Sequence, residues 1–170
     1  MIYLLDASVL ISAHGLYYPV DRVPEFWEWL LHHAEIGEIK VPIEIFEEVK
    51  EGPEDEGRDL LFDWITDADV KEALLLKEEV DPTLVNQVVG EGYAPDLTDS
   101  ELEQLGRDPF LIAYALADAG SRCVVTAESS KPSKKRQNRR IPDVCKGLKI
   151  RSIGTFELVK ELDFSTSWHK

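Results

Sequence analysis

A chain of 170 residues with 44% hydrophobic and 31% charged residues has the size and composition of one folded domain rather than of a disordered segment. No apolar run is long enough to span a bilayer, and no basic segment followed by an apolar core marks a secretion signal, so we expect a cytoplasmic protein without membrane contact. The net charge of −14 argues against broad attraction to nucleic acid, and the only cysteines, Cys123 and Cys145, lack a metal-binding spacing.

The first expected element is a strand at residues 2–5, which ends on Asp6. Four consecutive apolar residues are typical of a strand buried on both faces, as in a parallel sheet. Such a strand delivers the residues after it to the carboxyl edge of the sheet, where open α/β folds keep their sites. Asp6 and the hydroxyl of Ser8 fall at this edge. Capping of the helix expected over residues 8–14 is the alternative role for both.

Helices are expected over residues 24–34 and 42–50, with a short strand between them. The buried stripe of the second helix is formed by three apolar residues, Ile45, Phe46 and Val49. At about 100° per residue, Glu48 lies roughly 105° from the centre of this stripe, whereas Glu44 and Glu47 lie at roughly 150°. Glu48 is therefore the acid at the edge of the buried face, and we select it as a candidate site residue.

Residues 54–106 are acidic and helical in pattern, and we expect them to form a helical insertion around one α/β core. Within them, Thr98 and Glu101 match a capping box, which predicts a short helix before Gly106. No repeat of fixed period and no long linker divides the chain. Residues 1–170 are therefore predicted to form a single domain.

The next expected helix begins at Asp108-Pro109 and is strongly apolar. Asp is a favoured N-cap and Pro a favoured first helical residue, so Asp108 has a capping role as its alternative. A buried strand over residues 123–126 follows the helix, and Glu128 comes two residues after Thr126. A second strand thus ends on a hydroxyl and an acid, as the first one does.

A basic segment at residues 131–140, KPSKKRQNRR, contains six basic side chains and no acid. Such an island on an acidic protein is suited to recruit RNA or to dock an acidic partner peptide, and a solvated loop is the third interpretation. After it we expect a short helix at residues 141–145, a strand at 149–153 and a final helix capped by Thr155.

Four acids, Asp6, Glu48, Asp108 and Glu128, have reason to converge. Taken singly, each would be a cap, a surface residue or a loop residue. Packing four carboxylates together without cations is strongly unfavourable, because they repel one another and lose hydration. Mg²⁺ or Mn²⁺ resolves this conflict, and such an ion can activate a water and stabilise charge on a phosphodiester. No zinc pattern, phosphate-binding loop or nucleophile elbow competes with this interpretation.

The same residues resemble a PIN-domain ribonuclease, in particular the VapC-type toxins of toxin–antitoxin modules. The resemblance rests on Asp6 with Ser8, on Glu48 before Val49, on Asp108 before a buried helix, and on the run at residues 125–128; it covers most of the chain. The element at residues 141–145 is closer to a less characterised PIN-like branch. The resemblance implies a three-layer α/β/α sandwich with a mainly parallel central sheet. It also implies a metal-dependent endoribonuclease with a cognate antitoxin, and it allows a homodimer.

By this resemblance, Asp6, Glu48 and Asp108 hold Mg²⁺ or Mn²⁺, and Glu128 completes the site. Ser8 or Thr126 orients a water or a carboxylate. Glu128 stands where the family more often has Asp, which moves the carboxylate by roughly 1.5 Å. The implied reaction is attack of water on a phosphodiester of single-stranded RNA, leaving a 3′-hydroxyl and a 5′-phosphate. Five basic residues are the expected RNA contacts: Lys134, Lys135, Arg136, Arg139 and Arg140.

Two other functions compete with the ribonuclease. A non-catalytic PIN-like module would bind RNA or a protein through the basic segment and would show no metal-dependent turnover. A haloacid-dehalogenase-like phosphatase would also use an acid after the first strand. The sequence opposes that reaction, because Ser8 stands where its chemistry normally needs a second Asp.

Overall fold

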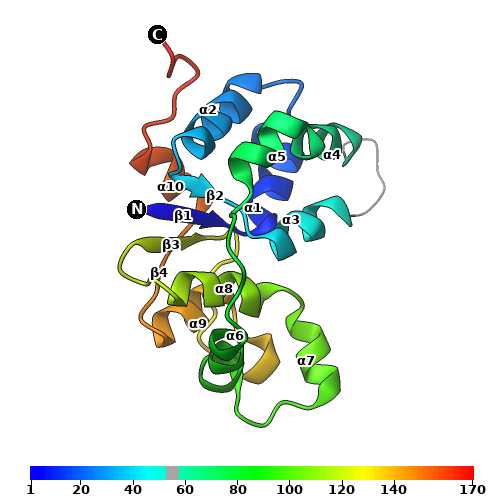
Figure 1. Ribbon diagram of the computed structural model, residues 1–170, viewed down its shortest axis with the longest axis vertical. Helices are drawn as coiled ribbons and strands as arrows, with labels where there is room; N and C mark the ends of the chain where they lie inside the picture. Colours follow the sequence, from blue (N-terminus) through cyan, green and yellow to red (C-terminus); the bar gives the residue numbers. More distant parts are fainter. Residues whose placement is uncertain (53–57) are drawn as a thin grey trace.

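A parallel sheet forms the centre of the protein, whose computed structural model describes residues 1–52 and 58–170 (Figure 1). Four strands lie in the order β2-β1-β3-β4, and every neighbouring pair is parallel. Their bounds are β1 Ile2–Leu5, β2 Ile39–Lys40, β3 Arg122–Val125 and β4 Arg151–Ile153. The sheet confirms the expected α/β class with a parallel core.

Helices cover both faces of this sheet, which confirms the three-layer arrangement (Figure 1). One face carries α1 (Ala7–Ser12), α2 (Pro24–Glu35) and α10 (Thr155–Glu161). The other face carries α8 (Asp108–Leu116) and α9 (Ile141–Gly147). This alternation follows from right-handed crossovers between parallel strands, because the chain moves to β2 on one side of β1 and to β3 and β4 on the other.

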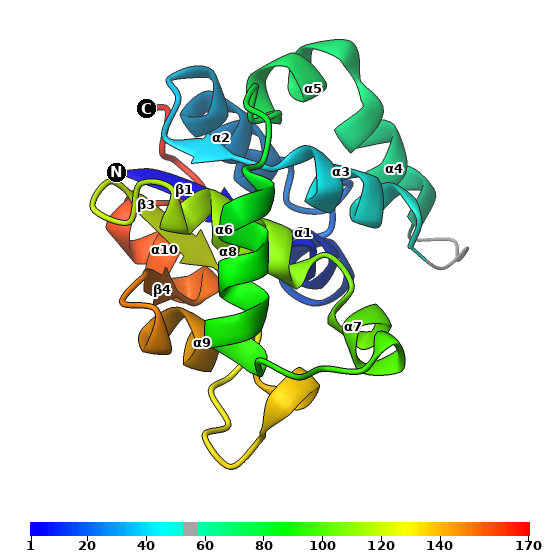
Figure 2. The ribbon, with the colours of Figure 1, turned by 60° about the horizontal axis from the view of Figure 1, so that its bottom comes forward.

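The expected acidic insertion is mainly helical in its described part, with non-helical connections at residues 75–81 and 94–98, and its first residues, like Pro53, lie outside the described residues. Figure 2 shows α6 running beside α8, and the loop of the basic segment, in yellow, protruding below α9. No helix in residues 1–52 and 58–170 is long and apolar enough to cross a membrane. The elements from residue 43 to residue 105 are α3 Ile43–Lys50, α4 Arg58–Thr66, α5 Ala68–Leu74, α6 Pro82–Gln87, the π-helical turn η2 Val88–Tyr93 and α7 Asp99–Leu105.

Two expected caps are wrong. Asp108 is the first residue of α8, and Arg107 occupies the N-cap position without a capping hydrogen bond. Thr155 lies inside α10, where the main-chain N–H of Gly154 donates to the Glu157 carboxylate at 2.8 Å instead. In both cases the helix begins at the expected cap residue, one position earlier than expected, so that the preceding residue occupies the capping position.

The register of the two central strands positions the site. Leu5 of β1 pairs with Val125 of β3, and both side chains are fully buried. The N–H of Asp6 then donates to the carbonyl of Val125 at 2.9 Å, which extends the pairing by one residue beyond β1. Because the strands are parallel and in this register, Asp6 and Thr126 leave the sheet side by side.

The π-helical turn η2 packs tightly against α9, and this contact predicts the effect of adding a methyl group. A Cβ at Gly92 would lie 2.7 Å from Cγ1 of Val144 and 3.3 Å from Cδ1 of Leu148. We expect Gly92→Ala to lower the free energy of unfolding by about 1–3 kcal/mol, because the α9 side chains must shift. Urea denaturation measures this loss.

Gly90→Ala is the matched control, because a Cβ at this position meets no atom within 4 Å. It should leave stability unchanged or raise it by about 0.4–1 kcal/mol through a less flexible unfolded chain. Equal midpoints for the two variants would contradict the tight packing of η2 against α9.

Candidate functional site

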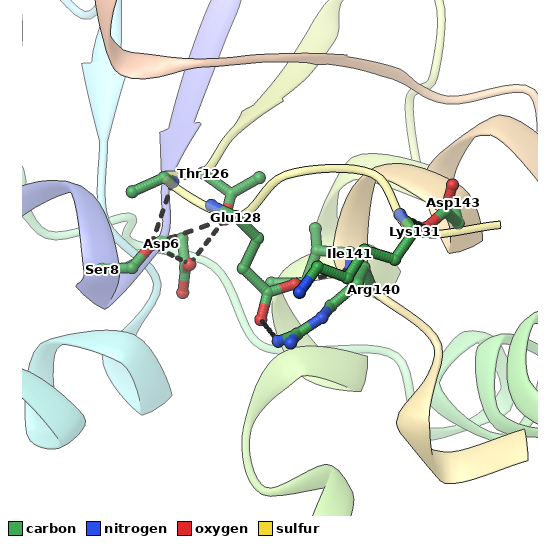
Figure 3. A network of polar contacts seen from close by, with 9 residues as sticks. Asp6, Ser8, Thr126, Glu128, Lys131, Arg140, Ile141 and Asp143 are labelled. Atoms are coloured by element: carbon green, nitrogen blue, oxygen red, sulfur yellow. Dashed lines mark hydrogen bonds and ion pairs between the residues drawn. The ribbon is translucent and has the colours of Figure 1, made fainter. Parts of the chain in front are cut away.

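Asp6 is held by hydroxyl groups that follow two neighbouring strands (Figure 3). Its Oδ2 accepts a hydrogen bond from Oγ of Ser8 and another, at 2.9 Å, from Oγ1 of Thr126. The side chain is buried, with 5% of its surface exposed. Asp6 occupies the N-cap position of α1 but makes no side-chain capping hydrogen bond. Capping is therefore wrong as the role of the Asp6 carboxylate.

Ser8 and Thr126 link this carboxylate to the loop after β3. Ser8 lies inside α1, so it does not cap that helix either. Its Oγ accepts a hydrogen bond from the N–H of Ala127 at 3.1 Å, and Oγ1 of Thr126 accepts one from the N–H of Glu128 at 3.1 Å. Each hydroxyl thus accepts from the loop and donates to Asp6, which fixes the carboxylate and the loop together.

Burial and a neighbouring charge raise the pKa of the Asp6 carboxyl, whereas its hydrogen bonds lower this pKa. Burial is the largest influence and raises the pKa of the Asp6 carboxyl, and the negative charge of Glu128 raises it further. The hydrogen bonds from Ser8 and Thr126 lower this pKa, because they stabilise the charged form. The net pKa is raised, because burial outweighs the stabilisation that these hydrogen bonds give to the charged form.

Asp108 shows that the four predicted acids influence one another. Burial raises the pKa of its carboxyl to about 8, with further contributions from the charges of Asp6, Glu128 and Glu48. The charge of Arg140 opposes this rise. No hydrogen bond from another described residue reaches the Asp108 carboxyl. The four predicted acids therefore lie near enough for their charges to influence the pKa of Asp108.

Glu48 contributes a buried oxygen that nothing satisfies. Its Oε2 is inaccessible to solvent and has no hydrogen-bond partner among the described residues. Burial raises the pKa of the Glu48 carboxyl, the charge of Asp6 raises it further, and the charge of Arg107 lowers it. Arg107 is itself bound by both carboxylate oxygens of Glu51, at 2.8 and 2.9 Å. Glu48 thus remains an acid without a direct cationic partner.

Glu128 is oriented differently from the other three acids. Its Oε2 accepts a hydrogen bond from the main-chain N–H of Ile141 at 2.9 Å, and its Oε1 lies 3.5 Å from Nη1 of Arg140. Figure 3 shows its side chain extending from the end of β3, away from Asp6 and toward the start of α9. The carboxylate thereby holds the first turn of α9. Its predicted role as a metal ligand stays a prediction.

The donor chemistry of the site fits a hard cation, although the acids do not form a closed cluster. No three His, Cys, Asp or Glu side chains in the described ranges lie close enough together to hold a metal ion. Asp6, Glu48 and Asp108 are nonetheless oxygen donors with raised pKa values, and one of their oxygens is buried without a partner. Carboxylates of this kind are the ligands that Mg²⁺ and Mn²⁺ prefer, and a bound cation removes their repulsion.

Two arginines of the basic segment serve the fold. Nη1 of Arg136 pairs with Asp96 at 2.8 Å, and its Nη2 pairs with Glu101 at 2.9 Å. Arg139 donates to the main-chain carbonyl of Gly92. These contacts fasten the segment to the acidic helical region.

The remaining predicted RNA contacts are more accessible. Lys134 and Lys135 are exposed, and no ion pair joins either of them to another described residue. Arg140 is partly exposed and makes the single long contact with Glu128. The structure thus divides the five predicted RNA contacts into two that hold the segment in place and three that remain accessible.

Tyr93 is a residue of this neighbourhood that the sequence did not reveal. Its hydroxyl is buried and has no hydrogen-bond partner within residues 1–52 and 58–170. Burial raises the pKa of Tyr93, and the charge of Asp108 is the next contribution. The π-helical turn η2 runs through Gly90 and Gly92 and ends at Tyr93. An aromatic residue directly after Gly92 was the only available signal.

Comparison with known proteins assigns a family but no activity. Residues 3–166 match the family model DUF4411, described as a domain of unknown function, and the chain therefore belongs to this family. No curated protein and no solved structure matches the chain. The function has to be inferred from the residues at the carboxyl edge of the sheet.

The raised pKa of Asp108 predicts how the stability of the metal-free protein depends on pH. An acid whose pKa is higher in the folded state than in the unfolded state loses folding stability as the pH rises from its unfolded pKa to its folded pKa. For Asp108 this window extends from about 4 to about 8. We expect Asp108→Asn to be more stable than the parent at pH 8 by about 2–4 kcal/mol. Urea denaturation in EDTA measures the difference.

At pH 4 most of the gain from Asp108→Asn should vanish, because the parent carboxyl is then protonated in the folded state and about half protonated in the unfolded state. Asp99→Asn is the control: Asp99 is also the first residue of its helix, α7, but it is exposed to solvent. This change should alter stability by less than about 0.5 kcal/mol at either pH. A gain for Asp108→Asn that does not change with pH would rule out the electrostatic explanation.

Proposed function

We propose that this DUF4411 protein is a metal-dependent endoribonuclease that hydrolyses phosphodiester bonds of single-stranded RNA. The observation that carries the proposal is the set of three coupled acids, Asp6, Glu48 and Asp108, at the carboxyl edge of a parallel sheet. Each has a raised pKa, and Oε2 of Glu48 is buried without a partner. Burial and the charges of neighbouring acids raise these pKa values, and a divalent cation would oppose both effects by favouring the charged carboxylates.

In this proposal Asp6, Glu48 and Asp108 hold Mg²⁺ or Mn²⁺, which supplies an activated water and stabilises negative charge on the phosphodiester. The residues of the chain position these groups. Ser8 and Thr126 donate to Oδ2 of Asp6 and so fix the direction of its carboxylate. Their contacts with the loop after β3 keep that loop at the edge of the site.

RNA has to approach an acidic site, so accessible cations support the proposal. Lys134 and Lys135 are exposed on the loop that follows Glu128. A flexible single strand that contacts these lysines would bring its backbone toward the acids, with an affinity that falls as salt is added. Single-stranded RNA fits this geometry because it needs no groove-shaped surface.

The biological setting in this proposal is that of a cytoplasmic toxin with a cognate antitoxin and, as an optional arrangement, a homodimer. The resemblance to VapC-type toxins supports the antitoxin. The free and buried state of Cys123 and Cys145 fits a reducing compartment. Co-expression with the product of the neighbouring gene, followed by co-purification, tests the antitoxin. Light scattering tests the dimer.

A PIN-like module without catalysis is the second candidate function. The observation that favours it is Glu128, whose carboxylate is engaged with Ile141 and Arg140 rather than with the other acids. Such a module would bind RNA in a salt-sensitive manner, and this binding would survive Asp6→Asn. Metal-dependent turnover by the parent protein excludes this candidate.

The ribonuclease proposal predicts cleavage of a fluorescently labelled single-stranded RNA in the presence of Mg²⁺ or Mn²⁺, and no cleavage in EDTA. Asp6→Asn and Glu48→Gln should each lower kcat/KM by at least about 100-fold, because each removes a carboxylate that would hold the metal ion. Gel-resolved cleavage rates measure this loss.

Glu47→Gln is the matched control, because Glu47 lies on the same helix as Glu48 but pairs with Lys50 at 3.1 Å. It should cleave at the rate of the parent. Circular dichroism establishes that all variants fold. Unchanged cleavage by folded Asp6→Asn and Glu48→Gln would show that the assigned acids are not the active site.

Metal binding is testable apart from activity. Mg²⁺ or Mn²⁺ at about 100 times its Kd should stabilise the parent by about 2.7 kcal/mol, because the ion binds the folded state only. The Tm should therefore rise on titration of the metal into EDTA-treated protein. Glu48→Gln should show a smaller rise, whereas Glu47→Gln should match the parent. Equal rises for all three proteins would place the metal elsewhere.

A further inference from the structure

Arg107 and Arg140 both interact electrostatically with the acids. They differ in how many of their N–H donors are already hydrogen-bonded. Arg107 donates to both carboxylate oxygens of Glu51, at 2.8 and 2.9 Å, and to the carbonyl of Glu44 at 3.1 Å. Arg140 has one side-chain contact within the described part of the chain, which is Nη1 to Oε1 of Glu128 at 3.5 Å. Its side chain is 38% exposed. Arg140 is thus the cation at this site with donors left for a ligand.

The position of Arg140 places its charge beside the acids. Arg140 is the N-cap residue of α9, and Figure 3 shows its guanidinium next to the Glu128 carboxylate. Its charge lowers the pKa of Asp108, so the two side chains also interact electrostatically. Arg136 and Arg139, from the same basic segment, point instead to the acidic helical region and to main-chain carbonyls.

The contact between Glu128 and Arg140 is weak enough for a ligand of Arg140 to replace the Glu128 carboxylate. An ion pair this long and this exposed contributes little to stability. The Glu128 carboxylate has a second partner, because its Oε2 accepts the hydrogen bond from the N–H of Ile141 at 2.9 Å. Glu128 therefore stays in place when Arg140 leaves it. A guanidinium offers five N–H donors in a planar fork that matches two oxygens of a phosphate.

We infer that Arg140 binds a non-bridging oxygen of the phosphate that is cleaved, and that it leaves Glu128 when RNA enters the site. This inference rests on the proposed ribonuclease function. The phosphate oxygen then takes the place that Oε1 of Glu128 holds at Nη1 of Arg140. Glu128 acts as the holder that keeps Arg140 at the site in the absence of RNA.

Kinetics of Arg140→Gln test this role. We expect kcat/KM on a single-stranded RNA oligonucleotide to fall by about 10- to 100-fold, the effect of losing one charge-assisted hydrogen bond to the substrate. Arg140→Lys should recover part of the loss, because it restores the charge but not the fork. Lys146→Gln is the matched control: it removes one positive charge from an exposed position on the same helix and should cleave like the parent.

A chemically altered substrate separates phosphate contact from a structural role. A methylphosphonate at the linkage that the parent cleaves removes the charge of that one phosphate. In the Asp6→Asn background, fluorescence anisotropy should show about 10-fold weaker binding of this RNA than of unmodified RNA. Adding Arg140→Gln should abolish the difference between the two RNAs. An equal difference in both backgrounds would overturn the inference, even if Arg140→Gln folds poorly.

The outcomes for the inference and for the proposed function are distinct. A parent protein that never cleaves RNA with Mg²⁺ or Mn²⁺ overturns the ribonuclease proposal and, with it, the role of Arg140. A parent that cleaves RNA, together with an Arg140→Gln variant that cleaves equally well, overturns only the role of Arg140. Loss of cleavage in Arg140→Gln with a matching loss of discrimination against methylphosphonate supports both.

Discussion

The pairing of β1 with β3 is the constraint on which the site depends. It continues one residue past β1 through the hydrogen bond from Asp6 to Val125, and it places two hydroxyls beside one buried carboxylate. Neither strand alone would hold Asp6, because Ser8 and Thr126 are 118 positions apart in the sequence. Burial of the strands in a parallel sheet makes this register robust, since a slip by one residue would move every side chain to the other face.

Charge is distributed unevenly across the molecule, and the distribution explains how an acidic protein keeps an acidic site. Two arginines pair closely with acids outside the site: Arg136 with Asp96 and Glu101, and Arg107 with Glu51. Asp6, Glu48 and Asp108 have no comparable partner among the described residues, and burial, together with the charges of neighbouring acids, raises their pKa values. Each unpaired buried acid destabilises the folded state, so stability alone would favour its replacement. Their presence together is therefore more economically explained by a ligand than by stability.

The sequence predicted the parallel sheet, its flanking helices and the strand ends that bear Asp6 and Thr126, because runs of buried apolar residues determine these features. It also selected Glu48 by helical periodicity. The sequence could not predict the orientation of the Glu128 side chain, because this orientation depends on an N–H of Ile141 that only the tertiary fold brings near. Helix starts were misplaced by one residue, because a favoured capping residue does not guarantee that it is used. Periodicity also placed Glu44 in solvent, whereas its Oε2 is buried.

The contacts of Arg136 have a consequence for the loop that contains Lys134 and Lys135. A basic loop in free motion would lose conformational entropy each time it closed on a ligand. Arg136 anchors the end of this stretch to α7 and to Asp96, with the main chain held in a left-handed conformation at φ 53°. Much of this loss of conformational entropy therefore occurs when the protein folds, before any ligand binds. The two lysines are presented in a preorganised loop, which favours a rapid and reversible encounter with a polyanion over slow induced fit.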